Sequence, residues 1–129
     1  MISKEQKRSE FALGRIEKVI QGNGKVSEEL ASFIVGTPTM ILQNGFGQTM
    51  AYLLSKCKGT FKAHDKHYFT FESISRWCEG ENQNVPSNNP LSFLKKISEL
   101  KQAEYLALQE EALKMLQWLK RYARAFQEE

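Results

Sequence analysis

Apolar residues recur along the chain at intervals of three and four, the spacing that places side chains on one face of an α-helix. The first such segment, residues 4–21, places four apolar side chains on one face, namely Ala12, Ile16, Val19 and Ile20. Gly22-Asn23-Gly24 follows, and we expect it to end the helix because glycine readily adopts the terminating backbone conformation. No segment shows the sustained alternation of a β-strand, so we predict an all-α fold.

Capping residues and helix breakers divide the middle of the chain. Ser27 is a good N-cap for a second helix, and two glutamates follow it near the positive end of the helix dipole. We expect Gly36 and Pro38 to kink or interrupt this helix, because proline lacks a backbone donor and clashes with the preceding turn. The sequence Asn44-Gly45 is a second stop signal. A third helix is predicted to follow, with Phe46 and Cys57 among its inward residues.

Two polar stretches, residues 58–66 and 80–89, have the composition of loops. Between and after them, three capping signals predict the remaining helices: Thr70 for a fourth, Asn89-Pro90 for a short fifth, and Ser98 for a long final helix that reaches about Phe126. We therefore predict a compact bundle of about five to six helices with a long C-terminal helix, in a single domain over residues 1–129.

Length and composition limit the class of protein. At 129 residues with 41% hydrophobic residues, the chain can bury one proper core and is too apolar to be disordered. No stretch approaches the roughly 20 apolar residues of a membrane span, and the first ten residues lack the apolar region of a secretory signal. We expect a cytoplasmic protein whose Cys57 and Cys78 are free thiols.

Positive charge is concentrated on one side of the first predicted helix. A continuous stripe at helical spacing carries four cations and one aromatic residue: Lys4, Arg8, Phe11, Arg15 and Lys18. The acids Glu10 and Glu17 fall near the opposite side. Such a stripe can follow a phosphate backbone, with the aromatic ring stacking on a base. The alternative is a solvated face, with Phe11 at the edge of the core.

A second basic segment covers residues 56–67, which contain four lysines, two histidines and a single acid. Its formal charge is as large as the +3 of the whole chain. A flexible basic loop can hold a polyanion without recognising its sequence. A solvated loop without a ligand is the alternative.

The final helix is apolar over an unusually wide sector. One seam consists of Tyr105, Leu108, Ala112, Met115, Leu119, Tyr122 and Phe126, and should pack on the rest of the domain. A second strip consists of Leu100, Ala107, Trp118 and Ala125, while Leu106 and Leu113 extend the seam on its other side. Such a helix is either central to the bundle or also contacts a partner.

Candidate chemistry is sparse. Cys57, His64, His67 and Cys78 could be imagined as a zinc site, but their spacing matches no ligand pattern, and Cys57 falls at an inward position. The glycines of residues 44–49 lack the lysine and the preceding strand of a P-loop. No nucleophile elbow or metalloprotease motif occurs either. We therefore expect no metal, no cofactor and no enzymatic activity.

Two segments resemble a known family. The first is Asn44-Gly45-Phe46-Gly47-Gln48-Thr49, followed by a short apolar helix that ends in Ser55-Lys56. The second, residues 111–125, contains Glu111-Ala112-Leu113 and then Trp118-Leu119-Lys120-Arg121-Tyr122. Tyr105 precedes the second block, as in that family. Both blocks resemble the small subunit of the type III-B (Cmr, or RAMP-module) CRISPR effector complex.

The resemblance implies a non-catalytic helical subunit, several copies of which stack head to tail as a minor filament. Its implied partners are further copies of itself, other subunits of the complex, guide RNA and target RNA, with no membrane. Recognition of the target is left to base pairing, so the protein need only contact the backbone. The expected RNA-binding residues are Lys56, Lys120, Arg121 and Arg124 in the matched blocks, and Arg8, Arg15 and Lys18 on the charge argument.

The motif glycines have a predicted structural role. Gly45 can end one helix with a positive φ, and Gly47 allows the next helix to approach closely. We expect Asn44, Gln48 and Thr49 to form caps or inter-helix hydrogen bonds, with an RNA contact as the alternative. Three other functions stay open: a stand-alone helical DNA-binding regulator, a protein-interaction scaffold without nucleic acid, and an unrecognised enzyme.

Overall fold

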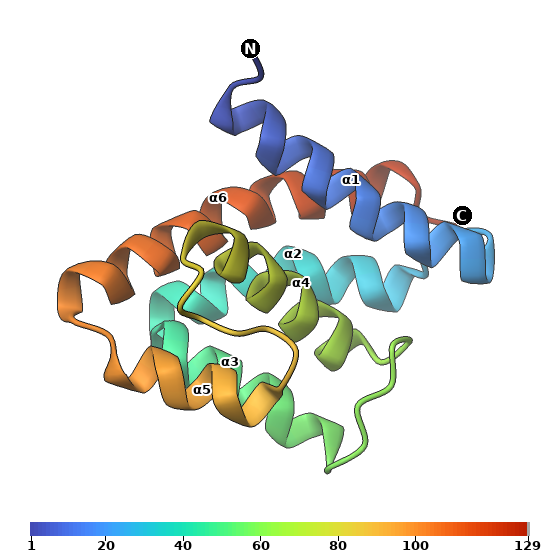
Figure 1. Ribbon diagram of the computed structural model, residues 1–129. Helices are drawn as coiled ribbons and strands as arrows, with labels where there is room; N and C mark the ends of the chain where they lie inside the picture. The colour runs from blue at the N-terminus through green and yellow to red at the C-terminus, as the bar shows by residue number, and fades with distance from the viewer. Residues whose placement is uncertain (129) are drawn as a thin grey trace.

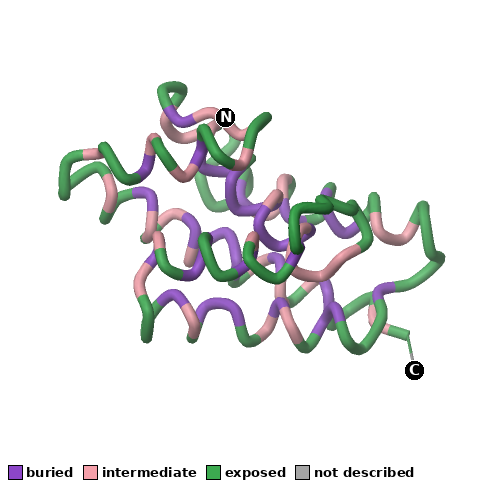
Figure 2. The backbone as a smooth tube through the Cα atoms, turned by 90° about the horizontal axis from the view of Figure 1, so that it is seen from below, coloured by how far each residue is buried: buried purple, intermediate pink, exposed green. Residues whose placement is uncertain are grey.

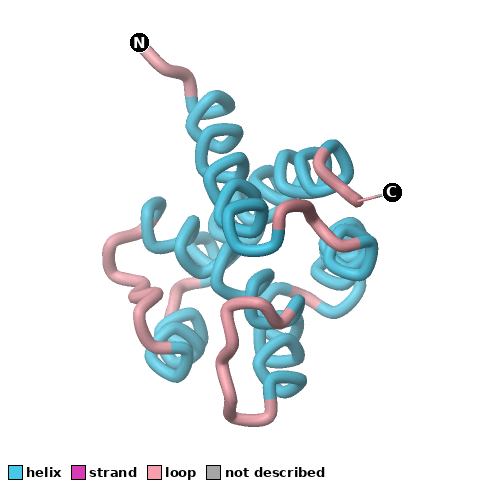
Figure 3. The backbone as a smooth tube through the Cα atoms, turned by 90° about the vertical axis from the view of Figure 1, so that its right-hand side faces the viewer, coloured by secondary structure: helices cyan, strands magenta, loops and turns pink. Residues whose placement is uncertain are grey.

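The computed structural model describes residues 1–128 and contains six helices in that part of the chain. They are α1 (Lys4–Asn23), α2 (Glu28–Asn44), α3 (Phe46–Cys57), α4 (Lys66–Glu81), α5 (Pro90–Glu99) and α6 (Gln102–Ala125). The predicted all-α bundle with a long last helix is confirmed, and Figure 3 shows the loops that connect the helices. The β-type pairing found in residues 1–128 is an isolated parallel bridge between Val26 and Gln127.

The helices form three layers (Figure 1). α1 and α6 lie along one side, α2 and α4 occupy the middle, and α3 and α5 form the opposite side. α6 packs against α1, α2 and α4, whereas α3 packs against α2, α4 and α5. The bridge at Val26 holds the segment after α6 beside the α1–α2 connection, so the ends of α1 and α6 are neighbours.

The core runs through all six helices, and buried positions line their inward sides (Figure 2). Phe46, Phe71 and Phe93 form a fully buried aromatic group in which Phe93 meets both other rings edge-on, at centroid distances of 6.5 and 5.6 Å. Full burial of a phenylalanine side chain stabilises a fold by about 1.5–3 kcal/mol. These rings therefore fix α5 on α3 and α4.

Several predicted helix boundaries are confirmed. The hydroxyl of Ser27 accepts the N–H of Leu30, and Oδ1 of Asn89 accepts the N–H of Ser92. Gly24 ends α1 with a φ of 85°, and Gly45 separates α2 from α3 with a φ of 89°. The seam of α6 is buried at its centre and half-buried at Tyr105 and Tyr122, and Phe126 at its end is exposed.

The predicted interruption of the second helix is wrong. α2 continues through Gly36 and Pro38 to Asn44. Thr37 and Pro38 are buried, and the Thr37 hydroxyl donates to the carbonyl of Phe33 within the helix. Packing of the apolar residues on both sides of Pro38 into one core outweighs its local cost, which is about 3 kcal/mol for an interior proline.

Two predicted caps are also wrong. Asp65, not Thr70, caps α4 by accepting the N–H of His67, while the Thr70 hydroxyl donates to the Lys66 carbonyl inside the helix. Ser98 lies inside α5, where its hydroxyl donates to the Leu94 carbonyl. α6 starts four residues later, at Gln102. Serine and threonine satisfy their hydroxyls within a helix as readily as at its start, so residue type alone does not fix a boundary.

None of the helices in residues 1–128 combines the length and the hydropathy that a membrane span requires.

Candidate nucleic-acid interface

The middle of the cationic stripe of α1 faces the neighbouring helices, and its two ends, Lys4 and Lys18, are exposed. Arg8 and Arg15 are 7% and 5% exposed. Lys4 is partly exposed and pairs with Glu81 of α4. Phe11 is half-buried and packs against Trp77, with the ring centroids 5.2 Å apart. The predicted exposure of the stripe is therefore wrong for Arg8, Phe11 and Arg15. Of the four cations in the stripe, only Lys18 has no charged partner within residues 1–128.

Arg8 is held by Glu111 of α6. Its Nε and Nη2 donate to the two carboxylate oxygens of Glu111, at 3.0 and 2.6 Å. Trp77 of α4 donates its Nε1–H to the same carboxylate at 3.1 Å. The hydrogen bond from Arg8 is the main cause that holds the pKa of Glu111 below its ordinary value, and the bond in turn raises the pKa of Arg8.

Arg15 is held by α4. Its Nε donates to the Ser73 hydroxyl at 2.8 Å, its Nη2 donates to Glu72 at 2.9 Å, and its guanidinium lies 4.8 Å from the centroid of the Phe69 ring. Burial lowers the pKa of Arg15, an effect that Glu72 opposes. Like Arg8, Arg15 uses its charge and its hydrogen-bond donors in contacts inside the protein.

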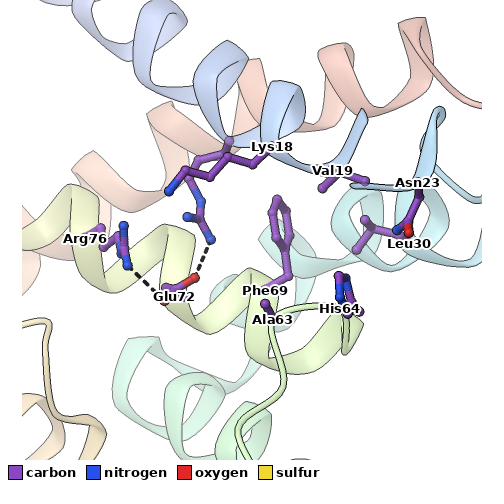
Figure 4. A pocket seen from close by; sticks show the side chains of 10 residues that line it. Lys18, Val19, Asn23, Leu30, Ala63, His64, Phe69, Glu72 and Arg76 are labelled. Carbon is purple, nitrogen blue, oxygen red and sulfur yellow. Dashed lines mark hydrogen bonds and ion pairs between the residues drawn. The ribbon is translucent and has the colours of Figure 1, made fainter. Parts of the chain in front are cut away.

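Lys18 stands at the rim of a pocket of about 280 Å³ between α1, α4 and the loop before α4 (Figure 4). Glu72 lies in this pocket and pairs with both Arg15 and Arg76, the latter at 3.1 Å. Three cations thus face one carboxylate, which leaves an excess of positive charge at the opening. Phe69 gives the pocket an apolar wall.

The predicted basic loop reaches the same place. α3 and α4 are joined by residues 58–65, and Lys58 and Lys62 are exposed there. His64 lines the pocket beside Lys18, and its Cε1 lies 3.9 Å from the position that a Cβ on Gly22 would occupy. Lys18 and the end of the loop at Ala63 and His64, which are far apart in the sequence, therefore line one pocket.

The other predicted residues lie elsewhere. Arg121 and Arg124 are exposed on the last turns of α6, and Lys120 is half-buried. Lys56 is exposed on the last turn of α3, and Figure 1 places that end on the opposite side of the bundle from the end of α6. The fold does not bring the seven predicted RNA-binding residues together in one site. It leaves five exposed or half-buried at three places and removes Arg8 and Arg15 to the interior.

The family described as "CRISPR-associated protein (Cas_Cmr5)" matches residues 4–126 of the chain. The chain belongs to the Cmr5 family. The family supplies a subunit of the Cmr, or type III-B, CRISPR complex, as the two sequence blocks predicted. The fold is also similar to the crystal structure of a CRISPR-associated Cmr5 family protein from Thermus thermophilus. The two chains are 20% identical, with a TM-score of 0.71 over 98% of each.

The Cmr5 motif at the α2–α3 junction is positioned by α6. The N–H of Gly47 donates to the Tyr105 hydroxyl at 2.7 Å, and the N–H of Phe46 donates to Oε1 of Gln109 at 3.1 Å. A Cβ on Gly47 would lie 3.1 Å from the Tyr105 oxygen, so the predicted close approach is confirmed.

The polar motif residues do not make the caps expected of them. Asn44 and Gln48 are exposed, and the buried hydroxyl of Thr49 has no hydrogen-bond partner among residues 1–128. Tyr105 and Gln109 of α6 supply the hydrogen bonds at this junction instead. The predicted structural role of Asn44, Gln48 and Thr49 is therefore wrong.

Sequence reasoning missed Arg76, the third cation at the pocket of Lys18. The sequence did hold a signal for Arg76. It lies four residues after Glu72, a spacing that places two side chains on one face of a helix, where they form an ion pair. Within residues 1–128, no three His, Cys, Asp or Glu side chains are grouped as metal ligands. Cys57 and Cys78 are buried and unbonded to each other, and burial raises the pKa of both thiols.

Proposed function

We propose that this Cmr5-family chain is a non-catalytic structural subunit that contacts target RNA, or the guide–target duplex, through nonspecific phosphate contacts in antiviral defence. One observation carries the proposal. None of the ion pairs formed within residues 1–128 involves Lys18, Lys56, Lys120, Arg121 or Arg124. Cations that form no ion pair within the protein are available to neutralise phosphates, and each such contact releases counterions.

The contrast with the buried arginines supports this division of roles. Arg8 and Arg15 form ion pairs with Glu111 and Glu72, so the proposal excludes them as phosphate contacts. Lys56, Arg121 and Arg124 lie in the last turns of α3 and α6, and Lys18 lies within α1. Such a surface binds a backbone without recognising sequence, which suits a complex whose specificity comes from base pairing.

The experiment measures binding of a fluorescent single-stranded RNA by anisotropy over a range of salt concentrations. We expect the triple variant Lys18→Ala/Arg121→Ala/Arg124→Ala to bind all sequences more weakly. The slope of log K against log[salt] should become shallower by about 0.7 for each phosphate contact removed. Lys95→Ala, an exposed cation on α5, is the matched control and should change the slope by one contact at most. A triple variant with the affinity and slope of the native protein would refute the proposed surface.

We further propose that several copies stack in the assembly through exposed apolar positions of α6. Leu106 is 48% exposed, and Ala107 and Ala125 of the second strip are exposed, whereas Trp118 is partly covered and donates to Glu5 of α1. Identical copies joined through two different surfaces form an open stack. Leu106→Asp should lower the number of copies per complex, measured by native mass spectrometry. Leu13→Asp, at an exposed position of α1, is the control. An unchanged copy number in Leu106→Asp would remove this residue from the contact.

A further inference from the structure

A second pocket lies at the α2–α3 junction, away from the pocket of Lys18. It has a volume of about 420 Å³ and is lined by Met40, Asn44, Gln48, Thr49 and Tyr52. That volume lies in the range of about 300–1,000 Å³ that is typical of small-ligand sites. Three of the five, Asn44, Gln48 and Thr49, are the polar motif residues that do not make the predicted caps.

Thr49 gives the pocket an unmet hydrogen-bonding demand. The residue is 1% exposed, and its hydroxyl has no partner among residues 1–128. A buried polar group without a partner costs about 1–3 kcal/mol, and such groups are rare enough in folded proteins to call for an explanation. The hydroxyl oxygen is itself covered, so a ligand atom would become its partner only if the side chains over it moved aside.

The other lining groups select the kind of ligand. Asn44 and Gln48 are exposed, and each amide offers both donors and an acceptor. Tyr52 is 43% exposed, and Nζ of Lys56 lies 5.5 Å from the centroid of its ring. Gln48, Tyr52 and Lys56 follow one another at intervals of four along α3, so they share one face of the helix. No carboxylate lines the pocket in the described part of the chain.

This row has the chemistry of a nucleotide site. Asparagine and glutamine amides pair with the edges of bases, an exposed tyrosine ring stacks on a base, and a lysine contacts phosphate. A peptide could also use the amides, but it would need an aromatic and an acidic side chain at matching positions, whereas a single nucleotide carries a base edge, a stacking face and a phosphate. The row therefore favours a nucleotide over a protein segment.

We propose that the pocket at the α2–α3 junction holds one unpaired nucleobase of the bound RNA. The base lies on Tyr52, its edge meets Asn44 and Gln48, and the adjoining phosphate meets Lys56. The inference rests on the proposed RNA contact and deepens it, because it adds contact with a base to a surface that otherwise touches only phosphates.

The test compares two fluorescent probes of equal length, a single-stranded oligouridylate and the corresponding abasic ribose-phosphate strand, binding to the full chain. We expect the native protein to prefer the base-containing strand. Tyr52→Leu should weaken oligouridylate binding by about 5- to 150-fold, which corresponds to a stacking contribution of about 1–3 kcal/mol per base. Gln48→Ala removes a hydrogen bond to the base edge and should weaken it by about two- to tenfold. Neither variant should change binding of the abasic strand or the salt slope.

Two control variants keep the result specific. Tyr52→Phe retains the ring and should retain most of the preference, and Gln43→Ala, an exposed amide outside the pocket, should retain all of it. Thermal unfolding of every variant checks that the fold is intact. In the assembled complex, a target RNA that contains 4-thiouridine should crosslink to the tryptic peptide of residues 26–56.

The possible failures are distinguishable. Salt-dependent binding that is equal for the two probes, with no crosslink to residues 26–56, refutes the base pocket and leaves the phosphate surface standing. No binding of either probe, together with no crosslink anywhere on the chain, refutes both proposals. Variants that bind RNA normally but no longer copurify with the other Cmr subunits show that the pocket contacts protein, which also overturns the inference.

Discussion

Arg8 and Glu111 join the first helix of the bundle to the last through two hydrogen bonds, of 3.0 and 2.6 Å. The same carboxylate accepts the indole N–H of Trp77, so one side chain ties together α1, α4 and α6. Both charges are largely removed from water, with 9% and 18% of the two side chains exposed. Loss of either partner would leave the other charge poorly solvated and unpaired.

We expect Arg8→Met to lower the free energy of unfolding by about 3 kcal/mol, because removal of one member of a buried ion pair leaves the charge of the other buried without a partner. Urea denaturation followed by circular dichroism measures the change. Arg121→Met removes an exposed arginine and should stay within about 0.5 kcal/mol of the native protein. Equal effects of the two variants would show that the pair contributes nothing to stability.

The same pair predicts how stability depends on pH. The hydrogen bond from Arg8 keeps the pKa of folded Glu111 below the ordinary 4.5. The unfolded chain therefore binds more protons in that range, and stability increases with pH. The contribution of Glu111 is present above pH 4.5 and is lost as the pH falls through the lower pKa of the folded state.

Urea midpoints measured between neutral and acidic pH test this dependence. Glu111→Gln should show a shallower decline in unfolding free energy at acidic pH than the native protein. Glu17→Gln, which removes an exposed acid of α1, should follow the native profile. A native-like acid decline in Glu111→Gln would assign the effect to other groups.

Gly45 has a backbone conformation that other residues rarely adopt, with a φ of 89° and a ψ of 162°. We expect Gly45→Ala to lower the unfolding free energy by about 1–3 kcal/mol. Gly14→Ala makes the same substitution in an ordinary helical position, with no atom within 4 Å of the new Cβ. It should stabilise the protein by about 0.5–1 kcal/mol. Calorimetric Tm values that shift in the same direction for both variants would contradict this account.

Gly47 and Tyr105 should be energetically coupled. Tyr105→Phe removes the hydrogen bond to the Gly47 N–H and should cost about 1 kcal/mol. Gly47→Ala places a Cβ 3.1 Å from the same oxygen, so it should be less harmful in the Tyr105→Phe background. A double-mutant cycle by chemical denaturation measures the interaction. Strict additivity would mean that the contact at Gly47 carries no strain.

The helices and the family were predictable because both depend on local signals. Gly24, Ser27, Gly45 and Asn89 act through their own backbone or their nearest neighbours, and the structure confirms all four. Pro38 shows the limit of such signals, since the core on both sides of it maintains a helix that its local chemistry opposes.

The burial of Arg8 and Arg15 depended on acids in other helices. Both arginines lie on the face of α1 that also carries Ala12, and this overlap with the apolar face was visible in the sequence. Their partners, Glu111 and Glu72, are 103 and 57 residues away, and only the fold brings them together. Helical periodicity shows which side chains share a face but not what that face meets.

The position of α6 in the bundle has a consequence during synthesis. α1 and α2 both pack against a helix that leaves the ribosome after every other helix of the bundle. Until then, the sides of α1 and α2 that face α6 lack that partner, although α2 can already pack against α3 and α4. Long-range contacts of this kind form slowly. The nascent chain therefore exposes apolar surface until α6 emerges, and exposed surface of this kind is what chaperones bind.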